Sequence, residues 1–207
     1  MNTGRLWILV TFVIIAMTGY FWGRGLDVPL GSRRAMISAE DQKPIVLPAR
    51  IKTTDCSVSN SLPDHGCTPG AVFPDVTVEK ICTLGHTKTV RNVSTSLKKQ
   101  VYREYGVSYP QPFGSYEADH FIPLALGGTN DIANLFPEAA EPTPGFREKD
   151  LVENYLHDQV CAGEMSLSAA QRVISTDWVA AFNGLSPAEI ASLKQKYRSW
   201  TKSSGSL

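Results

Sequence analysis

The stretch YEADHFIPLALGGTNDIANLFPE, residues 116–138, decides the fold. It opens on a β-prone segment, continues into the glycine pair Gly127-Gly128, and ends on a second short apolar piece, ANLFPE. Two short strand-forming segments joined by a glycine-containing loop are typical of a β-hairpin. We therefore predict a small antiparallel hairpin here.

Amphipathic helices are predicted on both sides of this hairpin. We expect four of them, near residues 96–106, 146–160, 169–182 and 187–199. The first ends on Gly106 in a position typical of a helix C-terminus. The third is expected to open at Ser168, and the fourth at a capping box formed by Ser186 and Glu189. A small hairpin combined with several helices indicates an α+β fold.

Composition excludes several classes of protein. The 207 residues are 43% hydrophobic and 19% charged, which is too apolar for a disordered chain and too mixed for a coiled coil. Twenty basic residues balance twenty acidic ones, so the chain lacks the basic excess of a non-specific nucleic-acid coat protein. Any polyanion must therefore be held by a local patch.

The N-terminal segment Leu6–Trp22 is an uncharged apolar run that follows Arg5. Its length suits a transmembrane helix, and its exit is formed by bulky aromatic residues that suit the membrane interface. A cleaved signal peptide has a shorter apolar centre and a small-residue exit. We expect an uncleaved signal anchor, with a cleaved export signal and a secreted protein as the alternative.

The four cysteines form an even set without a C-x-x-C pair: Cys56, Cys67, Cys82 and Cys161. This pattern argues against a zinc knuckle and favours two disulfides in an oxidising compartment. The three pairings that four cysteines allow stay open, as does the alternative of four free thiols in the cytoplasm. We expect a membrane-anchored protein with an extracytoplasmic domain.

These features divide the chain into five parts. They are a short flank (1–5), the anchor (6–22), a proline-containing linker (23–54), a folded domain (55–202, core 116–160) and a polar tail (203–207).

A basic strip occupies residues 80–103, which contain six lysines and arginines and no acidic residue. Arg91, Lys98 and Lys99 are our candidate nucleic-acid contacts in it. One-sided charge runs are also common on solvated helix faces, so that interpretation stays open.

The adjacent pair Asp119-His120 carries the chemistry that we expect. A carboxylate can hold a hard cation while the neighbouring imidazole takes a proton from an attacking water. Adjacent side chains alternate across a strand, so both reach one site only where the strand ends or bends. Pro123 and the glycine loop supply such an end.

The chain resembles the HNH endonuclease family on these residues and on Asn134, in the part of the sequence from about 116 to 160. That resemblance implies a ββα-metal core, in which a hairpin and a helix surround one metal ion. It further implies that His120 is the general base, that Asp119 is a metal ligand, and that Asn134 fixes the loop and orients the base. Weaker similarity to a bacterial HNH subgroup extends over most of the soluble part.

The helix ligand departs from the family spacing, because the expected position is Thr143 in a proline-rich stretch. Lys149, Glu153 and His157 follow at i, i+4 and i+8 on the next helix, and this stripe can face the hairpin. We predict His157 as the metal ligand and Glu153 as the second choice, with Lys149 contacting phosphate or pairing with Glu153. A helix histidine bonded to a backbone carbonyl is the alternative for His157.

The sequence thus predicts a membrane-anchored endonuclease that hydrolyses nucleic-acid phosphodiesters, with DNA as the expected substrate and RNA as the alternative. Mg²⁺ or Mn²⁺ is the expected metal, a histidine ligand would admit Zn²⁺ or Ni²⁺, and no organic cofactor is expected. One alternative is a non-catalytic, membrane-tethered module that binds nucleic acid or envelope on the same scaffold. Another is a metal hydrolase that acts on envelope polymers.

Overall fold

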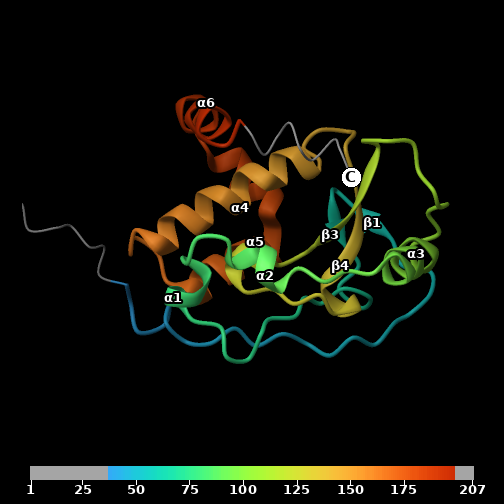
Figure 1. Ribbon diagram of the computed structural model, residues 1–207, viewed down its shortest axis with the longest axis horizontal. Helices are drawn as coiled ribbons and strands as arrows, with labels where there is room; N and C mark the ends of the chain where they lie inside the picture. The colour runs from blue at the N-terminus through green and yellow to red at the C-terminus, as the bar shows by residue number, and fades with distance from the viewer. Residues whose placement is uncertain (1–36, 199–207) are drawn as a thin grey trace, which may run out of the picture. The chain divides into compact units, whose positions relative to one another are not determined.

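The computed structural model describes residues 37–198, which form an α+β fold (Figure 1). Its elements in chain order are β1 (Val58–Ser59), β2 (Leu62–Pro63), α1 (Val78–Ile81), α2 (His86–Val90), α3 (Thr95–Glu104), β3 (Tyr116–His120), η1 (Leu124–Leu126), η2 (Ile132–Asn134), β4 (Leu135–Ala139), α4 (Phe146–Cys161), α5 (Leu167–Gly184) and α6 (Pro187–Lys196). The predicted anchor, N-terminal flank and tail lie outside the described residues. Within residues 37–198, no helix combines the length and apolar character needed to cross a membrane.

The predicted hairpin is formed by β3 and β4, which pair antiparallel with Asp119 opposite Phe136 and His120 opposite Leu135. Two 3₁₀ turns, η1 and η2, occupy the connection between the strands. Gly127 ends η1 with a φ of 81°, a left-handed conformation that favours glycine. The glycine pair therefore lies in the loop, as the sequence predicts.

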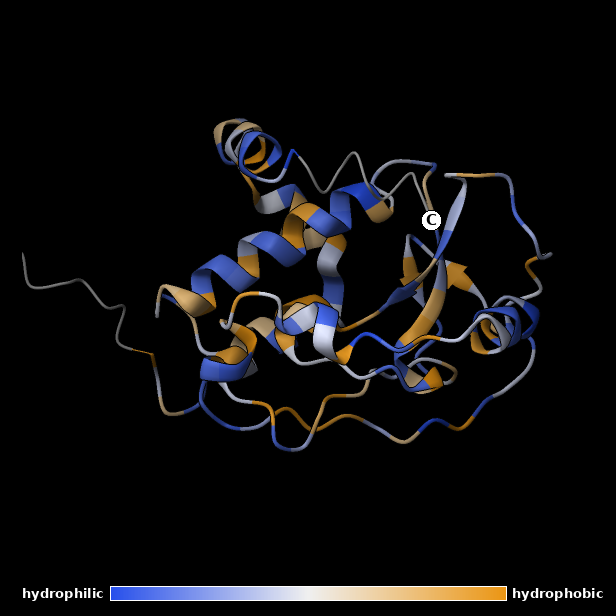
Figure 2. Cartoon of the chain, in the orientation of Figure 1, coloured by the Kyte–Doolittle hydropathy of each residue, from blue (hydrophilic) through white to orange (hydrophobic). Residues whose placement is uncertain are grey.

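Helix α4 packs beside the hairpin and against α5 (Figure 1). Hydrophobic and hydrophilic residues alternate along its ribbon in Figure 2. Leu151, Val152, Leu156 and Val160 are buried, and Trp178 of α5 joins the same core. This apolar arc is the one that the helical period predicts, and it fixes α4 so that Lys149 reaches Asp119 of β3.

The four predicted helices are present as α3, α4, α5 and α6, whereas the short helices α1 and α2 were not predicted. Helix α6 ends at Lys196 rather than near residue 199, and α5 begins earlier than expected. Ser166, not Ser168, is the N-cap: its hydroxyl accepts the backbone N–H of Ala169 at 3.0 Å. Ser166 has the extended backbone of a cap residue, whereas Ser168 already lies in the first turn. Helix α6 opens as predicted, with Ser186 and Glu189 forming the capping box.

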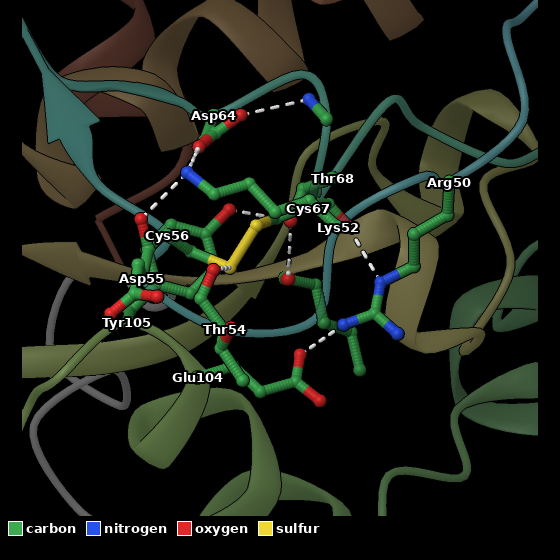
Figure 3. Close-up of a disulfide and its surroundings, with 12 residues drawn as sticks. Arg50, Lys52, Thr54, Asp55, Cys56, Asp64, Cys67, Thr68, Glu104 and Tyr105 are labelled. Carbon is green, nitrogen blue, oxygen red and sulfur yellow. Dashed lines mark hydrogen bonds and ion pairs between the residues drawn. A yellow bond between two sulfur atoms is a disulfide. The ribbon is translucent and has the colours of Figure 1, made fainter.

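All four cysteines are paired, Cys56 with Cys67 and Cys82 with Cys161. Figure 3 shows the first bridge and the residues around it, and both of its cysteines are buried. The Arg50 guanidinium forms an ion pair with Glu104 of α3.

Residues 37–54, which the sequence assigns to the linker, contact the folded part at several points. Besides the Arg50 ion pair, the backbone N–H groups of Ile51 and Lys52 donate to the carbonyl of Gly66 at 2.9 and 3.0 Å. At the other end, the guanidinium of Arg172 on α5 donates to the carbonyl of Lys43 at 2.9 Å. This part of the segment therefore runs along the domain surface.

Candidate active site

Asp119 and His120 lie at the C-terminal end of β3 and have different partners. The Asp119 carboxylate faces α4, where the Lys149 ammonium contacts its Oδ2 at 2.6 Å. The His120 imidazole contacts the loop instead, with Nε2 3.2 Å from Oδ1 of Asn130. Successive residues of a strand point to opposite faces, so this division follows from the pleat.

Asn130 determines which nitrogen of His120 carries the proton. The Asn130 amide is oriented by two backbone contacts: its Nδ2 donates to the carbonyl of Val90 at 2.7 Å, and its Oδ1 accepts from the N–H of Asn92 at 3.1 Å. The atom that faces His120 is therefore an oxygen, which can only accept. Nε2 must be the protonated nitrogen of the neutral ring, and the lone pair is left on Nδ1.

The His120 ring is neutral at physiological pH. Burial lowers the pKa of His120 to about 4, and the positive charge of Arg91 lowers it further, while Asp119 opposes the shift. Only 2% of the residue is exposed. A neutral imidazole with an available lone pair is the state that a general base requires.

Asn134 holds the loop between β3 and β4. Its Oδ1 accepts from the N–H groups of Ile122 and Ala71, at 2.9 and 3.3 Å, and its Nδ2 donates to the carbonyls of Ile122 and Thr129, at 2.8 and 2.9 Å. A Cβ at Gly128 would lie 1.8 Å from the Ile122 oxygen, so the loop closes this tightly only around glycine. Asn134 thus acts on His120 through the loop backbone.

Lys149 is the centre of the polar cluster between β3, β4 and α4. Its side chain is 0% exposed, and its ammonium contacts Asp119 at 2.6 Å, Glu153 at 2.5 Å and the carbonyl of His120 at 2.7 Å. Burial opposes its charge, but Asp119, Glu153 and Glu138 outweigh that cost and raise the pKa of Lys149 well above its usual value. Of the two predicted roles, pairing with Glu153 is the contact present; an enclosed ammonium offers no surface to phosphate.

Glu138 of β4 belongs to this cluster, although the sequence analysis did not select it. The residue is 1% exposed, and neither carboxyl oxygen accepts a hydrogen bond. Burial raises the pKa of Glu138 well above its usual range, while the Lys149 ammonium, 3.9 Å from its Oε2, opposes the shift. Its register opposite Glu117 could have revealed it, because alternate residues of paired strands share one face.

Asp119 is nevertheless ionised. Burial opposes its charge, yet the Lys149 ammonium, 2.6 Å from its Oδ2, holds the pKa of Asp119 well below its usual range. The other carboxyl groups differ: burial and neighbouring charges raise the pKa of Glu117 and Glu153 to about 7 and that of Asp150 to about 8. The cluster therefore contains more carboxyl groups than one ammonium can neutralise.

A hard divalent cation fits this donor set in part. Carboxylate oxygens are the ligands that Mg²⁺ and Mn²⁺ prefer, and the side chains of Asp119 and Glu153 are 19% and 17% exposed. The carboxylates are not gathered around one point. Among the described residues, the group whose potential ligand atoms all lie within 4.8 Å of one another is instead Cys82, His157 and Cys161.

His157 lies away from this cluster. Its Nε2 is 3.1 Å from the carbonyl oxygen of Ile81 and 3.5 Å from Sγ of Cys161. Eight residues separate it from Lys149, which is about 12 Å along a helix axis. His157 therefore has the contact expected of a helix histidine that is bonded to a backbone carbonyl. On α4, it is Glu153 that contacts Lys149, the residue paired with Asp119.

Three of the candidate nucleic-acid contacts, Arg91, Lys98 and Lys99, are exposed, whereas the fourth, Lys149, is buried. Arg91 follows α2 and is near enough to His120 and Glu153 to lower the pKa of both. Lys98 and Lys99 are exposed on α3, and the Lys99 ammonium lies 5.5 Å from the centre of the Tyr109 ring. These three cations are accessible to a polyanion.

No protein-family model, curated protein or solved structure matches this chain. The functional argument therefore rests on the residues and contacts of the site.

Proposed function

We propose that the domain is a metal-dependent endonuclease of the HNH type, which hydrolyses phosphodiester bonds of nucleic acid, with DNA as the first substrate to test and RNA as the alternative. The order of elements supports this proposal, because β3, a glycine loop, β4 and α4 follow one another as in a ββα-metal core. Asp119 and His120 end the first strand, and Asn134 precedes the second.

The observation that carries the proposal is the fixed tautomer of His120. With Nε2 bonded to Asn130, the lone pair on Nδ1 can accept a proton from water that attacks phosphorus. The ring is neutral before the reaction, so no prior deprotonation is needed. Asn134 keeps the loop, and hence the imidazole, in this position.

Asp119 and Glu153 would hold the divalent metal ion. Bound there, the metal would stabilise the negative charge that develops on the phosphate. Among the side chains of this protein, Lys149 keeps Asp119 ionised. Arg91, with Lys98 and Lys99 further along, would bind the backbone of the nucleic acid.

Extracytoplasmic localisation is part of the proposal. Two disulfides in the described residues are consistent with an oxidising compartment, and a membrane anchor at 6–22 remains our expectation.

The direct test compares cleavage of supercoiled plasmid by the full-length chain with and without Mg²⁺ or Mn²⁺. His120→Ala should reduce the rate by about 10²- to 10⁴-fold while DNA binding is retained. His86→Ala on α2 is a matched control and should cleave like the wild type. Equal loss of binding and rate in His120→Ala would make His120 a structural residue instead.

A non-catalytic binding module is the second candidate, and one observation favours it. The Asp119 carboxylate is already paired with a buried ammonium and His120 is almost fully enclosed, as in a scaffold that does not react. In the same assay, this alternative predicts wild-type DNA binding without cleavage at any divalent metal concentration. Digestion of cell-wall material alongside DNA distinguishes the envelope-polymer hydrolase.

A further inference from the structure

A second cluster of reactive side chains lies at the C-terminal end of α4. Cys161 is the last residue of that helix, and His157 precedes it by one turn on the same face. Cys82, at the C-cap of α1, approaches both of them and is bonded to Cys161. The two Sγ atoms and a ring nitrogen of His157 lie within 4.8 Å of one another.

We propose that reduction of the Cys82–Cys161 bridge creates a zinc site formed by the two thiolates and His157. Two sulfurs and one imidazole nitrogen match the ligand types that Zn²⁺ takes in proteins, and water would complete the tetrahedron. The thiolates exclude Mg²⁺ and Ca²⁺, which prefer oxygen. This site is separate from the carboxylate cluster at Asp119 and does not depend on the endonuclease activity.

The position of the Cys82–Cys161 bridge supports its reduction and the binding of zinc in its place. Cys161 is exposed, so a reductant can reach its sulfur. Both cysteines of the other bridge, Cys56 and Cys67, are buried. Among the described residues, no histidine, cysteine or carboxylate lies close enough to Cys56 and Cys67 to form a group of three potential metal ligands with them. The chain thus carries one bridge with a metal-binding neighbour and one without.

The reaction balances with a dithiol as the reductant. The Sγ–Sγ bond of Cys82 and Cys161 accepts two electrons and two protons, and the dithiol becomes a disulfide. Zn²⁺ then displaces the two thiol protons to solvent. The proton on Nε2 of His157, which is donated to the carbonyl of Ile81 in the bridged form, moves to Nδ1 so that Nε2 can bind the metal.

The test uses Co²⁺ as a spectroscopic probe and Zn²⁺ in competition with a chromophoric chelator. The full-length chain reduced with a phosphine should bind one metal ion per chain and show thiolate-to-cobalt charge-transfer absorption. The oxidised chain should show neither. Absence of this absorption in the reduced wild type would overturn the proposal.

Matched variants identify the ligands. The reduced double variant Cys56→Ser/Cys67→Ser should bind metal like the reduced wild type, whereas reduced Cys82→Ser/Cys161→Ser should lose binding. His157→Gln keeps an N–H donor for the Ile81 carbonyl but has no imidazole, so its affinity should fall at least tenfold. Binding that survives in Cys82→Ser/Cys161→Ser, or that is unchanged in His157→Gln, would contradict the assignment.

An alkylation experiment on the wild type gives an answer even if a variant fails to fold. Zn²⁺ should slow the alkylation of Cys82 and Cys161 in the reduced chain, mapped by mass spectrometry, and leave that of Cys56 and Cys67 unchanged. Equal protection of all four thiols, or of none, would overturn the proposal.

Discussion

The ammonium of Lys149 lies 2.6 Å from Oδ2 of Asp119, and the lysine side chain has no exposed surface. The carboxylate that the HNH resemblance assigns to the metal thus already has a cation at its side. A second ion must bind the remaining carboxylate oxygens, which lie on the more exposed side chains of Asp119 and Glu153. This contact makes Lys149 the residue on which the stability of the cluster depends.

Replacing Lys149 with methionine should lower the free energy of unfolding by about 3–5 kcal/mol, because it leaves buried carboxylates without their counter-charge. Urea denaturation at neutral pH measures the change. Lys88→Met on exposed α2 is the control and should stay within about 0.5 kcal/mol of the wild type. A loss below about 1 kcal/mol for Lys149→Met would mean that the cluster is hydrated or protonated throughout.

The loop that Asn134 holds should tolerate no side chain at Gly128. Gly128→Ala puts a Cβ against the Ile122 carbonyl and the Asn134 amide, so the loop must open at a cost of about 3 kcal/mol. Gly184→Ala in α5 is the control, since a Cβ there meets nothing within 4 Å. Thermal unfolding of both variants measures the difference, and similar midpoints would show that the loop can relax.

The hairpin, α4 and the loop glycines could be predicted because local patterns determine them. A glycine pair between two short β-prone segments specifies a hairpin, and the apolar period of 146–160 specifies a helix with one buried face. The burial of Lys149 could not be predicted in this way. Charged residues are rarely buried unless they are paired, and Asp119 and Glu138, which pair with Lys149, come from other elements.

The choice of His157 shows how helical spacing misleads over two turns. Positions i and i+4 share a face, which is why Lys149 meets Glu153. At i+8 the side chain has rotated by about 80° and risen by about 12 Å, so His157 meets Ile81 and Cys161 instead. The contacts of residues 37–54 with the domain could not be predicted from the sequence either, because several of them use backbone groups, which every residue type offers.

Asn130 should control the tautomer of His120. In the wild type, ¹⁵N NMR of the imidazole should show a proton on Nε2, since Oδ1 of Asn130 can only accept. Asn130→Ala removes this acceptor, so the ring should populate both tautomers and cleavage should slow. Asn154→Ala in α4, whose amide donates to the carbonyl of Asp150 and does not contact His120, is the control. A wild-type ring protonated on Nδ1 would contradict the assignment of the base.

The two disulfides should contribute unequally to stability. In the chain-entropy model, the cost of losing a bridge grows with the length of the loop that it closes. The separation is 79 residues for Cys82–Cys161 and 11 for Cys56–Cys67. Serine pairs should therefore cost about 4.5 and about 3 kcal/mol respectively, measured by denaturation without reductant. The opposite order would show that burial of Cys56 and Cys67 outweighs loop entropy.

The exposed lysines of α3 should determine how DNA binding depends on salt. Each phosphate contact made by a cation releases counterions, so Lys98→Glu/Lys99→Glu should weaken binding and lower the slope of log affinity against log salt by about two. Fluorescence anisotropy over a salt series measures the slope. Lys194→Glu/Lys196→Glu on α6 is a control of equal charge and should change the affinity for DNA but little. If the slope is unchanged in the α3 variant, or changes equally in both variants, Lys98 and Lys99 belong to a solvated helix face and do not bind DNA. Arg91 would then be the remaining candidate contact, close to His120.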